Sequence, residues 1–297
     1  MSGDLGRRLL VAAVGIPVGL VVIYLGGWVL GITLGAIAAL AAAEFYGLAA
    51  ARDVHPFSAL GAAAAAVAVL IAVVHSSPTS ATPLLYSLLL VLFLAVAGGS
   101  IWARGAERQP LNAAAATVGG TLYTGGTLCF GLFLRHLELA PVILSESGAS
   151  SAMIGSALLI FPVSLSWLND TFAYFGGRAW GRRKLMPSVS PGKTVEGSLA
   201  GLIGAVACGM LYAAFVFEAW LGVPVPVVAG ALAGALIAAA AQVGDLAESL
   251  LKRAAGVKDS GKLLPGHGGV LDRFDSLFFT LPIAYWFLWL ILPTIPS

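Results

Sequence analysis

The sequence predicts an all-α polytopic integral membrane protein with about nine transmembrane helices. Of its 297 residues, 59% are hydrophobic and only 10% are charged, which lies far outside the composition of soluble globular domains. The mean hydropathy is +0.95. Apolar runs of the roughly 20 residues that a helix needs to cross about 30 Å of hydrocarbon recur along the whole chain. Together these observations exclude a soluble fold.

The expected helices follow the apolar runs between polar connections. They lie near residues 9–25, 28–50, 57–75, 83–102, 113–137, 152–176, 197–220, 224–251 and 274–293. Arg7 and Arg8 before the first run also suit a cleavable signal peptide, but no A-x-A-like site follows, so we expect a retained helix. We divide the chain into an N-terminal part, 1–110, with four helices, and a C-terminal part, 111–297, with five.

The positive charges predict the orientation, because short cytoplasmic loops retain Lys and Arg. Five connections on one side would carry nearly all of them: Arg7 and Arg8; Arg52; Arg104 and Arg108; Arg178, Arg182, Arg183, Lys184 and Lys193; Lys252, Arg253, Lys258, Lys262 and Arg273. Only Arg135 breaks the pattern. An odd number of helices then places the N-terminus in the cytoplasm and the C-terminus on the opposite side. The cytoplasmic loops 177–196 and 252–273 are too short to fold alone, so chemistry must come from helix ends plus these loops.

Small residues at a spacing of four indicate close helix packing. The pairs are Gly27/Gly31/Gly35, Gly15/Gly19, Gly197/Gly201 and Gly230/Gly234. They suit either internal packing or a homodimer interface, and the sequence leaves both open. Cys129 and Cys208 lie in separate apolar runs, so we expect neither a disulfide nor a zinc site.

Asp245 follows the apolar run of the eighth expected helix and would share a face with Ser249 and Lys252. An Asp at the centre of a membrane helix costs roughly 2.5–3.5 kcal/mol unless it is compensated. Two compensations fit: an ion pair with Lys252 or Arg253, or a metal ion, for which oxygen donors suit Mg²⁺.

Asp272 and Asp275 stand three residues apart at the start of the ninth expected helix. Capping of that helix would explain one carboxylate. Both, together with Asp245, would form a three-carboxylate site. The preceding loop runs from Lys258 through Gly266–Gly269, where glycines around His267 would allow phosphate to approach the backbone; an ordinary loop histidine is the alternative.

Asp170 comes late in the sixth expected helix, beside Asn169, and suits either a hydrogen bond between helices or a contact with substrate or metal. The later triplet Gly192-Lys193-Thr194 is not a P-loop, because Pro187 occupies the position of the first glycine. We expect Ser190 to Thr194 to be a turn that enters the seventh helix, with Thr194 or Ser190 as its cap and Lys193 presented to an anion. The adjacent cations 182–184 would contact anionic lipid.

The C-terminal half resembles the signature of phosphatidate cytidylyltransferases, also called CDP-diacylglycerol synthases. The resemblance rests on Ser249-x-Leu251-Lys252-Arg253, Lys258-Asp259, Gly261, Leu264, Pro265, His267-Gly268-Gly269, Val270, Asp272-Arg273 and Asp275. The segments NDTFAYFGGR (169–178) and SVSPGKTVEGS (188–198) resemble further stretches of this family. Gly192 departs from the pattern, since many relatives have Lys there. The N-terminal half agrees by its topology.

This resemblance implies a reaction in which CTP and phosphatidic acid give CDP-diacylglycerol and pyrophosphate. It carries the metal-binding role to Asp245 and Asp272 in particular. We expect these two acids, with Ser249 or Asp275 nearby, to hold Mg²⁺, with a second cation left open, and we expect Asp245, Asp272 and Lys252 to be the catalytic residues. The expected substrate-binding residues are Asp170, Arg178, Ser190, Lys193, Ser249, Arg253, Lys258, His267, Gly268, Gly269 and Arg273. The expected partners are CTP, phosphatidic acid and membrane lipids, without nucleic acid. The expected location is a bacterial inner membrane, with the active site facing the cytoplasm.

Two other functions remain open from the sequence. A CTP-dependent lipid-alcohol kinase would use similar nucleotide contacts but release CDP. An ion-coupled transporter would place Asp170 and Asp245 at the midplane of the membrane, usually within inverted repeats or broken helices, and neither feature is visible in the sequence.

Overall fold

The computed structural model describes residues 2–103, 109–261, 263 and 268–294, and most of them are helical. Contacts group the chain into two units, Met1–Leu132 with Leu251–Phe274, and Phe133–Leu250 with Asp275–Ser297. The division at residue 110 followed the order of the helices along the chain. By contacts, the loop predicted to carry part of the active site joins the N-terminal helices instead.

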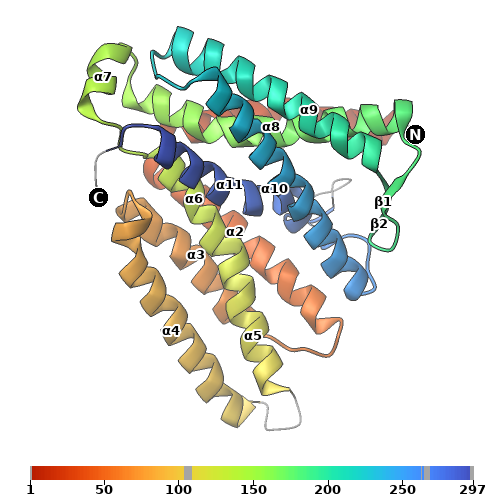
Figure 1. Ribbon diagram of the computed structural model, residues 1–297. Coiled ribbons are helices and arrows are strands. Elements are labelled where there is room, and N and C mark those ends of the chain that lie inside the picture. The colour runs from red at the N-terminus through yellow and green to blue at the C-terminus, as the bar shows by residue number, and fades with distance from the viewer. Residues whose placement is uncertain (1, 104–108, 262, 264–267, 295–297) are drawn as a thin grey trace. The chain divides into compact units, whose positions relative to one another are not determined.

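The first unit is a bundle of helices built around small side chains. Its helices are α1 (Ser2–Leu25), α2 (Gly27–Ala50), α3 (Ser58–Val74), α4 (Pro78–Ala103) and α5 (Pro110–Thr121), which continues through the π-helical turn η1 (Leu122–Gly126) into α6 (Thr127–Arg135). Helices α3, α4 and α5 pack side by side (Figure 1), with Ala64, Leu92, Val96 and Ala114 buried between them. Small residues at these positions let the helix backbones approach closely.

The second unit contains a pair of long helices joined by a hairpin. Its elements are α7 (Pro141–Ser147), α8 (Ser151–Trp180), β1 (Lys184–Met186), β2 (Ser190–Thr194), α9 (Val195–Leu211), the π-helical η2 (Tyr212–Trp220), α10 (Val227–Ala254) and α11 (Leu271–Ile291). Helices α8 and α9 lie along each other (Figure 1). Helices α10 and α11 each have one end in the first unit.

The antiparallel hairpin β1–β2 corrects the expectation that Ser190 to Thr194 is a simple turn. The connection doubles back because the Glu196 carboxylate, in the first turn of α9, accepts hydrogen bonds from the backbone N–H groups of Arg182 (3.0 Å) and Arg183 (3.1 Å). Thr194 caps α9 by accepting a hydrogen bond from the Gly197 N–H at 3.1 Å. The predicted cap is therefore confirmed for Thr194.

Most of the glycine pairs pack inside a unit. Gly31 and Gly35 of α2 face Val73 and Ala66 of α3. Gly197 and Gly201 of α9 face Ala173 and Asn169 of α8, and Gly230 and Gly234 of α10 face Gly209 and Ala205 of α9. Internal packing is thus the role of these pairs. Gly15 and Gly19 of α1 have nothing within 4 Å of their Cβ positions.

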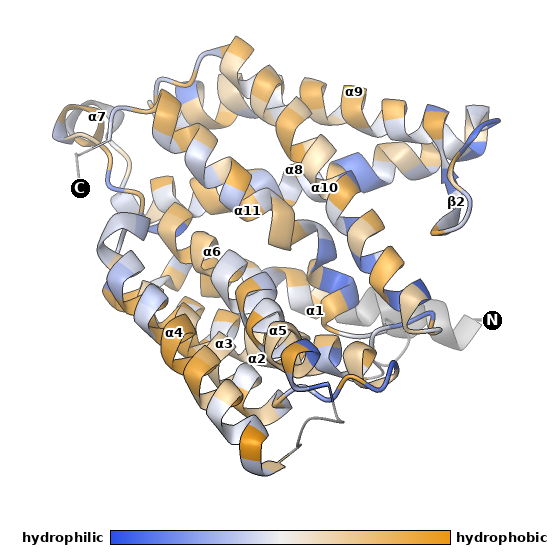
Figure 2. Cartoon of the chain, turned by 60° about the horizontal axis from the view of Figure 1, so that its bottom comes forward, coloured by the Kyte–Doolittle hydropathy of each residue, from blue (hydrophilic) through white to orange (hydrophobic). Residues whose placement is uncertain are grey.

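The helices make this an integral membrane protein. Six described segments are long and apolar enough to cross a membrane: Gly27–Ala50, Pro78–Ala103, Ser151–Trp180, Val195–Trp220, Val227–Ala254 and Leu271–Ile291. Ala13–Leu25 and Ser58–Val74 are shorter apolar helices. Figure 2 shows hydrophobic residues along α3 and α4 and hydrophilic residues on β2. Arg135, the exception among the charges, is only 7% exposed and so is not a loop residue facing water.

Candidate active site

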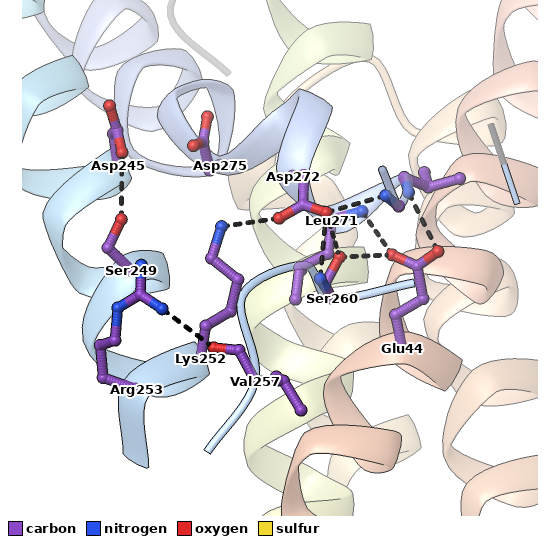
Figure 3. Close-up of polar contacts among 12 residues, drawn as sticks. Glu44, Asp245, Ser249, Lys252, Arg253, Val257, Ser260, Leu271, Asp272 and Asp275 are labelled. Carbon is purple, nitrogen blue, oxygen red and sulfur yellow. Dashed lines mark hydrogen bonds and ion pairs between the residues drawn. The ribbon is translucent and has the colours of Figure 1, made fainter. Parts of the chain in front are cut away.

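Asp272, in the first turn of α11, organises the loop that follows α10. Its Oδ2 accepts hydrogen bonds from the Gly269 N–H (2.8 Å), the Ser260 N–H (3.0 Å) and the Ser260 hydroxyl (3.0 Å), as Figure 3 shows. Its Oδ1 lies 2.7 Å from Nζ of Lys252, and the two side chains are only 9% and 13% exposed. These contacts are those of a helix cap and of an ion pair, and the role of Asp272 as a metal ligand stays a prediction.

Glu44 of α2 is the second acid at this loop, and the sequence analysis missed it. Its Oε1 accepts a hydrogen bond from the Val270 N–H at 3.0 Å, and its Oε2 accepts from the Leu271 N–H at 2.8 Å. Oε2 also lies 2.9 Å from the Ser260 hydroxyl (Figure 3). A signal was available, because a single acid within an apolar membrane helix marks a functional site by default.

Three described glycines of this loop, Gly261, Gly268 and Gly269, are required by the two carboxylates. Gly268 has φ +81°, which favours glycine, and a Cβ there would stand 2.7 Å from Oδ2 of Asp272. A Cβ on Gly261 or Gly269 would collide with the carboxylate of Glu44. The backbone here thus binds the protein's own acids. His267 lies outside the described residues, so its predicted role stays a prediction.

Three described cations in and beside this loop lie at the surface. Arg253, Lys258 and Arg273 are exposed. Arg253 donates a hydrogen bond to the Val257 carbonyl at 3.3 Å, which holds the beginning of the loop.

The second unit contains a cavity of about 590 Å³ that collects four of the predicted residues, Asp170, Arg178, Lys193 and Asp245. Nζ of Lys193 lies 2.6 Å from Oδ2 of Asp245. The ion-pair partner expected for Asp245 was Lys252 or Arg253, so this pairing with Lys193 is a correction. The hairpin is the reason, because β2 carries Lys193 to the cavity. Predicted Ser190 pairs with Met186 in the hairpin and is outside the cavity lining as far as the chain is described.

Ser249 shares a helix face with Asp245, as predicted, since its hydroxyl lies 3.4 Å from Oδ1 of that carboxylate. Gly244 is the residue before Asp245, and a Cβ atom on it would stand 2.7 Å from the Asp275 carbonyl oxygen and 3.2 Å from Cα of Ser276. The backbones of α10 and α11 therefore approach each other closely at this point. This contact brings Asp245 beside Asp275.

Asp170, Asp245 and Asp275 come from three helices and lie close enough for their charges to repel one another. The Lys193 ammonium offsets one of the three charges. Over the described part of the chain, no three acidic, histidine or cysteine side chains converge tightly enough to hold a metal ion as they stand. The chemistry of the donors nevertheless fits a hard divalent cation, because carboxylate oxygens are the ligands that Mg²⁺ prefers.

An amide network that the sequence analysis missed orients Asp170. Nε2 of Gln242 donates to Oδ1 of Asn169 (2.9 Å) and to the Ser198 carbonyl (3.0 Å), and the Ser198 hydroxyl donates to Oε1 of Gln242. Nδ2 of the fully buried Asn169 donates to Oδ1 of Asp170 at 3.1 Å. The hydrogen bond between helices is therefore made by Asn169, which leaves Asp170 to line the cavity. Gln242, a polar residue in an apolar run, was the available signal.

The predicted site residues thus form two groups. Lys252, Arg253, Lys258, Gly268, Gly269, Asp272 and Arg273 belong to the first unit. Asp170, Arg178, Ser190, Lys193, Asp245, Ser249 and Asp275 belong to the second. A metal site shared by Asp245 and Asp272 joins residues of different units and stays a prediction.

Comparison with known proteins identifies the family. The model of the cytidylyltransferase family matches residues 6–291. The phosphatidate cytidylyltransferase of Synechocystis sp. is 33% identical over 307 residues, which cover 97% of this chain and 98% of the relative. The enzymes of the same name from Bacillus subtilis and Brucella abortus are 43% and 47% identical over 134 and 133 residues, covering 45% of this chain in each case and 48% and 47% of the relatives. Because the similarity extends over nearly its whole length, the chain belongs to the cytidylyltransferase family.

Proposed function

We propose that this protein transfers a cytidylyl group from CTP to phosphatidic acid, giving CDP-diacylglycerol and pyrophosphate for phospholipid synthesis. The observation that carries the proposal is the 590 Å³ cavity, where Arg178 and Lys193 stand beside Asp170 and Asp245. A nucleoside triphosphate needs such cations for its phosphates and such acids for its divalent ion. Apolar helices around the site suit an acceptor whose acyl chains stay in the bilayer.

The reaction needs positioning and charge neutralisation more than covalent catalysis. An oxygen of the lipid phosphate attacks the α-phosphorus of CTP in line, the bond from that phosphorus to the bridging oxygen breaks, and pyrophosphate leaves with the electron pair. Lys193 and Arg178 bind phosphate oxygens and stabilise the charge that develops on them. Lys252 is the further catalytic cation that the sequence predicts, and in the structure its ammonium pairs with Asp272.

Asp245 and Asp275, with Asp170 beside them, are the carboxylates that would hold Mg²⁺ in the second unit. Asp272 is the further ligand that the sequence predicts. When bound, Mg²⁺ neutralises charge on the phosphate oxygens of CTP. Lys193 offsets only one of three mutually repelling carboxylates, so the remaining charge favours a divalent cation there. A second cation remains open.

The remaining predicted contacts complete this proposal. Ser249 orients Asp245 through its hydroxyl. The residues left for phosphate or head-group contacts are Ser190, Arg253, Lys258, His267, Gly268, Gly269 and Arg273.

The proposed topology has nine transmembrane helices, a cytoplasmic N-terminus and a C-terminus on the opposite side of a bacterial inner membrane. The burial of Arg135 supports it, because the remaining cations then segregate to one face. The active site faces the cytoplasm, where CTP is available. A homodimer remains one of the proposed states. Its candidate contact is the pair Gly15 and Gly19, because no other atom lies within 4 Å of their Cβ positions.

The test is turnover of purified protein in detergent with labelled CTP and phosphatidic acid. We expect one pyrophosphate for each CDP-diacylglycerol, loss of turnover in EDTA, and recovery when Mg²⁺ is restored. Release of CDP with a lipid alcohol as acceptor would instead indicate the lipid-alcohol kinase. A folded preparation that releases no pyrophosphate from CTP and phosphatidic acid in the presence of Mg²⁺ would refute the proposed reaction.

A further inference from the structure

Helix α2 holds both ends of the loop between α10 and α11. At the beginning of the loop, Nε of Arg52, just after α2, donates to the Ala254 carbonyl at the last residue of α10. At its end, the Glu44 carboxylate accepts the Val270 and Leu271 N–H groups. First-turn N–H groups of a helix have no partner within the helix, so Glu44 supplies one from another helix.

The Ser260 hydroxyl couples Glu44 to Asp272. It lies 2.9 Å from Oε2 of Glu44 and 3.0 Å from Oδ2 of Asp272 (Figure 3). A serine hydroxyl has one proton and can donate to only one of these oxygens at a time. A change at Glu44 therefore alters the hydrogen bonding of Asp272, and through it the position of Lys252.

We propose that Glu44 is a positioning residue for cytidylyl transfer, which fixes Ser260 and the first turn of α11 so that Asp272 and Lys252 keep their reactive geometry. The inference rests on the proposed function. It assigns part of the active site to an N-terminal helix, 216 residues before Ser260. The side chain must be a carboxylate of this length, because three donors converge on its two oxygens. The carboxylate also lies where a Cβ atom on Gly261 or Gly269 would be, so only glycine leaves room for it.

The central variant is Glu44→Gln, which replaces one acceptor oxygen by an NH₂ donor that cannot accept from Ser260, Val270 or Leu271. We expect kcat to fall about 10- to 100-fold while KM for CTP stays within about threefold, because the loss is one of geometry in the transition state. Glu44→Asp should recover part of kcat. Glu218→Gln, at an exposed position in η2, is the matched control and should behave as wild type.

A double variant separates positioning from general destabilisation. If Glu44 acts through the Ser260 hydroxyl, Glu44→Gln/Ser260→Ala should be no slower than Glu44→Gln, within about threefold. A purely structural role would instead make the two losses multiply. Hydrogen exchange gives a readout without substrate: the amides of Val270 and Leu271 should exchange faster in Glu44→Gln, with the second unit unchanged.

Wild-type kcat in Glu44→Gln, multiplicative losses, or unchanged exchange at Val270 and Leu271 would each overturn the inference. If Glu44→Gln does not give folded protein, Ser260→Ala decides, and a kcat equal to wild type would refute the coupling. Failure of the proposed reaction would appear separately, as a wild-type protein that releases no pyrophosphate while Val270 and Leu271 remain protected.

Discussion

Gly201→Ala should disturb the candidate active site through a packing contact between α8 and α9. A Cβ at this position would stand 2.7 Å from Oδ1 and 2.8 Å from the carbonyl oxygen of Asn169, where ordinary contact begins at 3.4 Å. Asn169 is fully buried and bonded to both Gln242 and Asp170, so it cannot give way freely. Overpacking of this kind costs about 1–3 kcal/mol.

The expected result is a lower melting temperature, by about 2–5 °C for a chain of this size, and a kcat/KM reduced about tenfold because Asp170 is displaced by a fraction of an ångström. Thermal unfolding in detergent and pyrophosphate release measure the two effects. Gly98→Ala in α4 is the control, since its Cβ meets nothing within 4 Å and should leave both quantities unchanged or slightly raise stability. Equal behaviour of the two variants would refute the packing argument.

Two further pairs of variants test the charges. Lys193→Met should lower kcat/KM for CTP about 100- to 1,000-fold, as removal of a transition-state donor does, with Lys193→Arg retaining more; a steady-state rate near wild type for Lys193→Met would exclude a phosphate contact. Asp272→Asn should lose most turnover in the same assay while the exposed loop variant Asp259→Asn retains it. Full turnover in Asp272→Asn would remove the metal assignment, and loss in Asp259→Asn alone would move the site into the loop.

The helices could be predicted because hydrocarbon leaves the backbone few alternatives. A chain segment in a bilayer must satisfy its own N–H and C=O groups, so an apolar run of sufficient length becomes a helix whatever its neighbours are. The hairpin β1–β2 has no such constraint. Its eleven residues include Pro187 and Pro191 and lack alternation of apolar and polar residues, and its closure depends on Glu196, a residue of the following helix.

Four acids, Asp170, Asp245, Asp272 and Asp275, could be singled out for a similar reason, since an ionisable residue beside an apolar run needs compensation. Glu44 could have been found in the same way. The partners of these acids could not. Helix geometry indicates neighbours three or four residues away, so Lys252 or Arg253 was the ion-pair partner considered for Asp245, with a metal ion as the alternative. The actual partner, Lys193, arrives on a hairpin from another loop, and Glu44 meets Ser260 across 216 residues.

Each unit pairs one predicted ligand acid with one predicted phosphate-binding lysine, Asp245 with Lys193 and Asp272 with Lys252. Removing one partner from such a pair leaves a poorly solvated charge, which is costly beside hydrocarbon. In the proposed reaction, a phosphate of CTP would replace the carboxylate as the partner of Lys193, and a divalent cation would offset the charge of Asp245. The pair then exchanges its internal partners for external ones without leaving a charge uncompensated. Loss of Lys193 should therefore weaken binding of CTP with its cation more than binding of phosphatidic acid alone.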